Sequence, residues 1–132
     1  METTAQQITD YIERFRRGDR DGAFFSLLEM EHGILPQLME VFRHELDGRV
    51  REFLVEVIWQ HRQPSVIPFL GEALHDSEPL VWRQALDGLV TMASPASLET
   101  LRNVRPRQQI GELRLWLDEA IYQVESEISR HK

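Results

Sequence analysis

The chain of 132 residues contains no cysteine, which excludes disulfide bonds, thiolate metal sites and cysteine nucleophiles. It has no run of about 18 apolar residues, so no segment is predicted to span a membrane. Its first eleven residues lack the basic and apolar regions of a secretory signal peptide. These absences predict a soluble, cytoplasmic protein that folds as a single domain over residues 1–132.

Lysine is nearly absent, because Lys132 is the only lysine among 15 basic residues and the others are arginine. Such a strong preference for arginine is a hint of a GC-rich bacterial genome. Asp and Glu total 22, which gives a net charge of −7 with neutral histidines. A negative surface repels phosphate backbones and attracts basic proteins. The composition therefore favours a basic protein partner over a nucleic acid.

Apolar residues recur with helical spacing along the whole chain, and no segment alternates for long with a period of two. Glycine, proline and capping residues divide this pattern into short helices. Helices are expected at about residues 4–17, 21–31, 35–45, 48–62, 65–75, 78–93, 95–104 and 108–129. The sequence thus predicts an all-α fold.

Similar segments recur every 31 or 32 residues. Ile34-Leu35-Pro36 returns as Val66-Ile67-Pro68, which is 32 positions later. The second helix of each pair repeats three apolar positions: Val50, Leu54 and Ile58, then Val81, Ala85 and Leu89, and more loosely Leu113, Leu117 and Ile121. A period of this length, split into two helices by a short turn, is typical of an α-solenoid, in which each hairpin buries its apolar stripe against its neighbours.

The segment PFLGEALHDSEPLVWRQALDGL, residues 68–89, resembles a HEAT repeat of the short bacterial, PBS-lyase type. The positions that match the family pattern are Pro68, Asp76, Pro79, Val81, Ala85 and Leu89. Trp82 departs from it, since the family commonly has arginine there. The resemblance covers about residues 34–125. It implies a right-handed α-solenoid of three hairpins (34–63, 64–94 and 95–132) with an N-terminal helical cap (1–33), and a role in protein interaction.

Patterns that would support catalysis or metal binding are weak. Glu29 and His32, like Glu72 and His75, have the Glu-x-x-His spacing of di-iron helical bundles. Both pairs fall at predicted helix ends, however, and no facing carboxylates accompany them. HEAT-like deoxyhypusine hydroxylases bind iron through several His-Glu dipeptides, and this chain has one, at residues 44–45. We therefore expect no catalytic residue, no metal site and no cofactor.

A helical-wheel comparison of the second helices places Trp59, Val90 and Tyr122 at equivalent positions, next to charged side chains. An aromatic anchor with a polar rim is typical of a protein-binding hot spot. The candidate partner-binding residues are Glu52, Glu56, Trp59, Arg83, Asp87, Val90, Asp118 and Tyr122. The charged members are expected on the inner face of the stack, where replacing Glu52 and Glu56 with lysine would abolish partner capture and leave stability nearly unchanged.

The alternative is that Trp59, Val90 and Tyr122, together with Leu86, pack between repeats and are not exposed. The sequence leaves these two interpretations open. Trp82, Trp116 and His61 lie nearer to the predicted core stripes, and we expect them to pack inside the protein.

Three functions fit these features. The first is a non-catalytic module that binds a basic protein through the inner face, in its most specific form a bacterial immunity protein that masks a toxin. The second is an accessory or lyase-like protein, since some HEAT-like proteins attach bilin chromophores. The third, nucleic-acid binding as in HEAT-like DNA glycosylases, is disfavoured because the central repeats carry Glu52, Glu56 and Asp87 where a cationic groove would be needed.

Overall fold

The structure is a computed structural model that describes residues 2–104 and 111–131, and all regular elements within these ranges are helical. The helices are α1 (Thr4–Arg16), α2 (Arg20–Glu29), α3 (Leu35–His44), α4 (Gly48–Gln60), α5 (Ile67–Ala73), α6 (Pro79–Met92), α7 (Pro95–Val104) and α8 (Glu112–Arg130). Two 3-10 turns, η1 (His32–Ile34) and η2 (Pro64–Val66), lead into α3 and α5. The predicted all-α fold class is confirmed.

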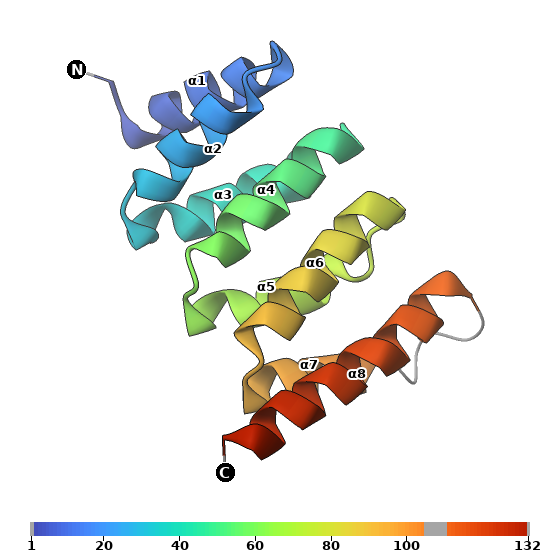
Figure 1. Ribbon diagram of the computed structural model, residues 1–132. Helices are drawn as coiled ribbons and strands as arrows, with labels where there is room; N and C mark the ends of the chain where they lie inside the picture. Colours follow the sequence, from blue (N-terminus) through green and yellow to red (C-terminus); the bar gives the residue numbers. More distant parts are fainter. Residues whose placement is uncertain (1, 105–110, 132) are drawn as a thin grey trace.

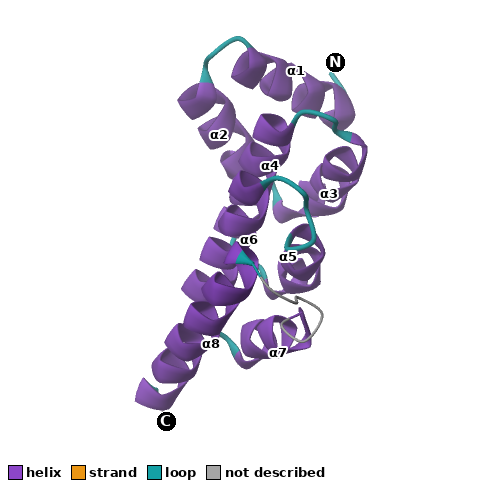
Figure 2. Cartoon of the chain, turned by 90° about the vertical axis from the view of Figure 1, so that its right-hand side faces the viewer, coloured by secondary structure: helices purple, strands orange, loops and turns teal. Residues whose placement is uncertain are grey.

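The helices form successive hairpins that stack from the N-terminus to the C-terminus (Figure 1). Seen from the side, α4, α6 and α8 form one layer and α3, α5 and α7 form another (Figure 2). Within the first layer α4 packs against α6 and α6 against α8, and within the second α5 packs against α7. The hairpin of α1 and α2 continues the stack, because α2 lies against α4. This arrangement is an α-solenoid.

Helix α4 lies at the centre of the hydrophobic core. It buries seven side chains, more than any other helix in the described part of the chain: Val50, Phe53, Leu54, Val55, Val57, Ile58 and Trp59. Aromatic contacts join neighbouring hairpins on both sides of it. The rings of Phe15 and Phe53 stack with centroids 4.3 Å apart, and those of Phe42 and Phe69 meet edge to face at 5.0 Å. The core therefore runs through all the hairpins as one continuous cluster.

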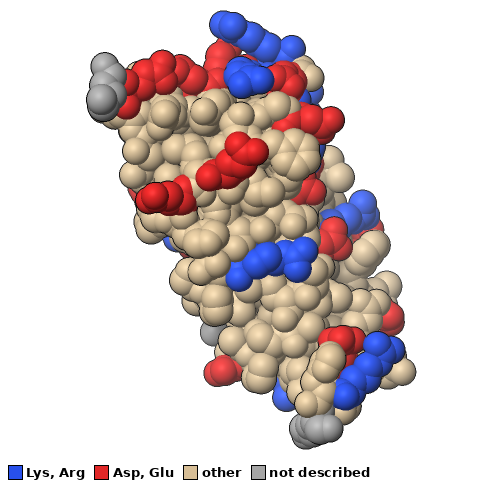
Figure 3. Space-filling model, turned by 60° about the vertical axis from the view of Figure 1, so that its left-hand side comes forward, with Lys and Arg blue, Asp and Glu red and all other residues tan. Residues whose placement is uncertain are grey.

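Charged side chains are unevenly distributed on the outside of the stack. On the side shown in Figure 3 they are sparse over the middle of the molecule and gather towards its two ends. No helix in residues 2–104 and 111–131 has the length and hydropathy needed to cross a membrane.

The helix boundaries differ from the predicted ones mainly where proline or extended backbone intervenes. The helix expected at 65–75 is regular only from Ile67 to Ala73, since Pro64 begins a 3-10 turn instead. The helix expected to reach residue 31 ends at Glu29, because Met30 has an extended backbone with ψ at 156°. The predicted start of the last helix, residue 108, lies outside the described residues.

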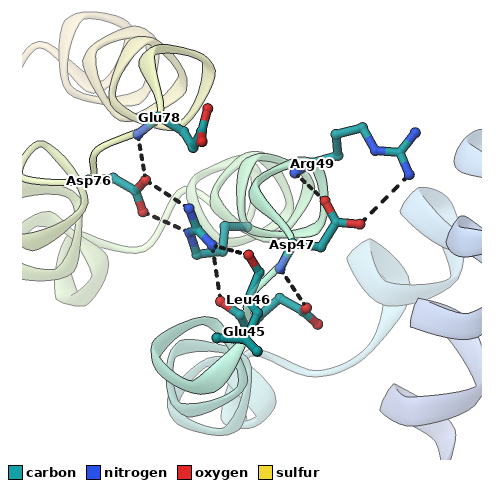
Figure 4. A network of polar contacts seen from close by, with 7 residues as sticks. Glu45, Leu46, Asp47, Arg49, Asp76 and Glu78 are labelled. Carbon is teal, nitrogen blue, oxygen red and sulfur yellow. Dashed lines mark hydrogen bonds and ion pairs between the residues drawn. The ribbon is translucent and has the colours of Figure 1, made fainter.

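Arg51 on α4 connects the turns of two neighbouring hairpins (Figure 4). Its Nε and Nη2 donate to the two carboxylate oxygens of Asp76, at 2.9 and 3.1 Å. Its Nη1 donates to the carbonyl oxygens of Glu45 and Leu46, at 3.1 and 2.9 Å. Asp76 also accepts the backbone N–H of Glu78 at 2.9 Å, immediately before α6. One guanidinium group thus positions the turn before α4 and the turn before α6.

The next junction along the stack is built differently. Trp82 occupies the position equivalent to Arg51, 31 residues later. Its ring meets that of Trp116 edge to face with centroids 6.3 Å apart, and the guanidinium carbon of Arg83 lies 5.5 and 5.3 Å from the two ring centroids. Arg83 also pairs with Glu112 at the start of α8. Aromatic and cation–π contacts here take the place of the bidentate Arg–Asp pair.

We expect Arg51→Met to lower the free energy of unfolding by about 2–4 kcal/mol, because it removes the positive partner of the Asp76 carboxylate and the side-chain donor to two backbone carbonyls. The side chains of Arg51 and Asp76 are only 15% and 9% exposed, so water compensates poorly. Urea denaturation followed by circular dichroism measures the loss. Arg49→Met is the matched control, since Arg49 is 80% exposed and should change stability by less than about 0.5 kcal/mol. Equal effects of the two substitutions would contradict this role of Arg51.

Candidate protein-binding face

A groove of about 390 Å³ crosses the layer formed by α4, α6 and α8. Its lining comes from all three helices: Trp59, Leu86, Asp87, Val90, Thr91, Trp116, Glu119, Ala120 and Gln123. We call it the second-helix groove. A neighbouring depression of about 500 Å³ shares Val90, Thr91 and Gln123 with it and continues between α6 and α8 to the end of α8. The two together form a long, partly apolar channel on one face of the stack.

Trp59 forms part of the packing between α4 and α6, and it is only 6% exposed. Its indole Nε1 donates to the side-chain oxygen of Gln84 at 2.7 Å. The ring lies so close to Gly88 that a Cβ atom there would be 2.7 Å from Cγ of Trp59. The Arg62 guanidinium covers the ring, 5.1 Å from its centroid. The ring therefore bridges two repeats and contributes to the groove from its floor.

The other members of the predicted apolar row have different environments. Val90 is partly buried and lines both the groove and the depression beside it. Tyr122 is 66% exposed; it lines the neighbouring depression but not the groove. Positions that are equivalent in the repeat therefore change from buried to exposed along the stack. The cause is position, since α4 is covered by hairpins on both sides and no further helix among the described residues covers α8.

Trp116 corrects one expectation. It was predicted to pack inside the protein, but it is 45% exposed and forms part of the groove wall. Trp82 and His61 are buried as expected, at 6% and 4% exposure. The signal for Trp116 was present in the sequence, because Trp116, Ala120 and Gln123 have the spacing of one helix face and share it with Glu119.

Glu52 and Glu56 lie on the same face but are engaged within the molecule. Arg20 of α2 donates to both oxygens of Glu52, at 3.1 and 3.3 Å, and to Glu56 at 3.0 Å. Burial lowers the pKa of Arg20, but the hydrogen bonds and charges of the two glutamates outweigh it and raise that pKa. Gln84 donates to Glu52 at 3.0 Å and accepts from Trp59. These residues join α2, α4 and α6.

Asp87 and Glu119 are the two carboxylates in the lining of the groove, and neither is paired with a basic side chain in that lining. Asp87 on α6 is exposed, and within the described residues it has no hydrogen bond or ion pair. Partial desolvation, followed by the charge of Glu56, raises the pKa of Asp87. Glu119 on α8 is exposed and accepts one hydrogen bond, from Gln123 at 3.1 Å. The groove thus carries negative charge on two of its walls without a basic side chain in its lining.

The remaining predicted site residues lie beside this groove. Arg83 contacts Trp82, Trp116 and Glu112, and it is not in the lining. Asp118 is exposed on α8 and is also outside the lining. For residues 2–104 and 111–131, no group of three or more histidine or carboxylate side chains is arranged to hold a metal ion.

A family model of HEAT repeats matches residues 35–121. The chain belongs to the HEAT repeat family. The match starts at the first residue of α3 and ends within α8, and the hairpin of α1 and α2 precedes it. Every residue of the groove lining except Gln123 lies within the matched range. No curated protein and no solved structure matches the chain. HEAT repeats commonly serve as protein-interaction modules, in which stacked helices present an extended binding surface.

We expect Trp59→Ala to lower the free energy of unfolding by about 3–5 kcal/mol, because it leaves a cavity between two HEAT repeats. Trp116→Ala is the matched comparison. It should cost less than about half as much, since Trp116 is 45% exposed and Trp59 is 6% exposed. Urea denaturation followed by circular dichroism measures both. A loss for Trp59→Ala as small as that for Trp116→Ala would show that Trp59 does not support the stack.

The structure changes the expectation for lysine at positions 52 and 56. Glu52→Lys with Glu56→Lys would place three cations together at Arg20, so we now expect stability to fall by about 1–3 kcal/mol. The glutamate side chains are only 16% and 27% exposed, which limits screening by water. The same charge change at Glu29 and Glu99, which are exposed and have no hydrogen bond or ion pair in the described part of the chain, should cost less than about 0.5 kcal/mol. Equal stability of the two double variants would contradict the joining role of Arg20.

Proposed function

We propose that this HEAT-repeat protein is a non-catalytic binding module that holds a basic protein partner in the second-helix groove. The observation that carries the proposal is the pairing of an apolar groove with two carboxylates, Asp87 and Glu119, that no basic side chain in the lining neutralises. Such a site matches a partner segment that has an arginine or lysine next to apolar side chains.

Each part of the groove contributes differently to binding. Leu86, Val90 and Ala120 offer apolar surface, whose removal from water drives association. Trp116 presents a half-exposed ring against which the stem or the guanidinium of an arginine can stack. Asp87 then supplies a charged acceptor for that guanidinium.

The state of Asp87 supports a cationic occupant. Its pKa is raised by desolvation and by the nearby charge of Glu56, so its ionised form lacks compensation in the free protein. A guanidinium or ammonium group would provide that compensation on binding. The net charge of −7 acts in the same direction, because it attracts a basic partner over a longer range and makes association faster at low salt.

The most specific form of this proposal is a cytoplasmic, bacterial immunity protein that masks a basic toxin such as a nuclease. The acidic composition and the packed stack of hairpins support it. An inhibitor of this kind needs a preformed surface with complementary charge, and the groove has both features.

The test is affinity capture from lysate of the source organism, treated with nuclease, with three tagged proteins: wild type, Asp87→Arg with Glu119→Arg, and Glu29→Arg with Glu99→Arg. The double variants have the same net charge and the same number of exposed substitutions. We expect wild type and the Glu29/Glu99 variant to retain the same basic protein, and the Asp87/Glu119 variant to retain less than about a tenth of it. Quantitative mass spectrometry of the eluates measures the difference.

Equal retention by both double variants would overturn the groove as the binding site. In a parallel capture from lysate without nuclease treatment, retention of nucleic acid alone would overturn the protein partner itself. Salt gives an independent check, because binding through Asp87 and Glu119 should weaken between about 0.05 and 0.3 M NaCl.

A further inference from the structure

Two histidines face each other where the hairpin of α1 and α2 meets the first HEAT repeat. His61 follows the last turn of α4 and is 4% exposed, and His32 begins the η1 turn after α2. Their Nδ1 atoms are 2.9 Å apart, and the rings meet edge to face with centroids at 5.1 Å. His61 Nε2 lies 3.2 Å from the carbonyl oxygen of Leu27 in α2. We call these residues, with Gln63, the histidine corner.

The contacts determine where the protons lie. A carbonyl oxygen can only accept, so His61 carries its proton on Nε2 and donates to Leu27. His61 Nδ1 is then an acceptor, and His32 must donate to it from its own Nδ1. His32 Nε2 is left as an acceptor, and the side-chain amide of Gln63 donates to it at 3.2 Å. All the contacts are satisfied at once when both histidines are neutral.

Added protons disturb this arrangement in two steps. A first proton can enter at His32 Nε2 on the exposed ring, where the amide of Gln63 has to turn its oxygen towards the ring. A second proton has to enter at His61 Nδ1, and it would set two N–H groups and two positive charges against each other across 2.9 Å. The second step is therefore incompatible with the closed corner.

We propose that the histidine corner is an acid-labile connection, so that acidification below about pH 6.5 loosens the hairpin of α1 and α2 from the HEAT repeats before the rest of the stack opens. Opening lets His61 take up its proton in water. The corner shares no residue with the groove lining, so this proposal does not rest on the proposed function.

The other charged groups around the corner do not offset this effect. Arg62, the next residue, turns its guanidinium over Trp59 and donates to Gln60, and it would oppose a further positive charge. Glu29 in α2 and Glu31 before η1 are exposed, and within the described residues neither has a hydrogen bond or ion pair to a histidine. In agreement with this, burial lowers the pKa of His61. The hydrogen bond to Leu27 opposes the shift, and the charge of His32 adds to it.

Because the pKa of His61 is lowered, the hairpin of α1 and α2 is held less firmly as the pH falls. Because the pKa of His61 is lower in the folded than in the unfolded chain, its stabilising contribution is complete above the unfolded value, about 6.5, and is lost as pH falls below that value. The other connections of the hairpin, from Arg20 to Glu52 and Glu56 and from Arg16 to Glu45, join arginines to carboxylates. None of these three pairs contains a histidine, so the corner is the connection of this hairpin in which two histidines meet.

Hydrogen exchange with mass spectrometry on the full chain at pH 7.5 and 5.5, corrected for intrinsic exchange rates, tests the proposal. We expect protection factors over α1, α2 and η1 to fall about tenfold at pH 5.5, the limit for uptake of one proton with an unfolded pKa of about 6.5. Protection over α5 and α6 should stay constant. Equal behaviour of the two regions would overturn the proposal.

Variants assign the effect to the corner. His61→Gln keeps a donor for the Leu27 carbonyl but does not titrate, so its protection over α1 and α2 should be the same at both pH values. His75→Gln is the matched control, because His75 is exposed in the turn after α5 and its replacement should leave the tenfold change intact. A pH response that survives His61→Gln, or disappears in His75→Gln, contradicts the proposal.

Nitrogen-15 NMR of the histidine side chains in the wild-type protein gives a test that needs no variant. We expect His61 to carry its proton on Nε2 and His32 on Nδ1 at pH 7.5, and His61 to remain neutral at pH 5.5 in closed molecules. A His61 ring that becomes fully protonated near pH 6.5 while exchange protection is unchanged would overturn the proposal.

Discussion

The structure depends on one constraint: a helical hairpin of this length cannot bury its apolar stripe by itself. Each hairpin therefore packs against its neighbours, and the hairpin in the middle is the most buried. Helix α4 shows this directly, since it buries seven side chains between α2, α3 and α6. Burial of this kind is non-directional, so it brings the helices together without setting their register.

Polar contacts supply the register that apolar packing does not. Arg51 holds the turns before α4 and α6 in fixed positions, and Arg20 connects α2 to two glutamates of α4. The histidine corner adds a third directional contact, and this one depends on the protonation state of its two rings. Some charged residues of the stack thus join hairpins. Asp87 and Glu119 make no such connection, and we propose that they bind a partner.

The differences between repeats are as informative as the similarities. Where Trp82 replaces the arginine that is common in HEAT repeats, the junction is built from two tryptophans and Arg83 in place of the Arg–Asp pair. Trp82 contacts Trp116 of α8, and the exposed part of Trp116 lines the groove. A departure from the repeat pattern therefore coincides with the surface that we propose for binding.

The sequence by itself determined the helices, their pairing and the family, because helical periodicity and a repeat of 31 or 32 residues are local properties that survive without coordinates. It could not decide which side of a second helix faces a neighbour and which faces a partner. Trp59, Val90 and Tyr122 are equivalent in the repeat, yet they are buried, half-buried and exposed, because burial depends on the side chains that pack against each residue and not on the local pattern. Likewise, only the tertiary structure showed that Glu52 and Glu56 are paired with Arg20, over 30 residues away, while Asp87 is not paired, and that His32 and His61 share a hydrogen bond.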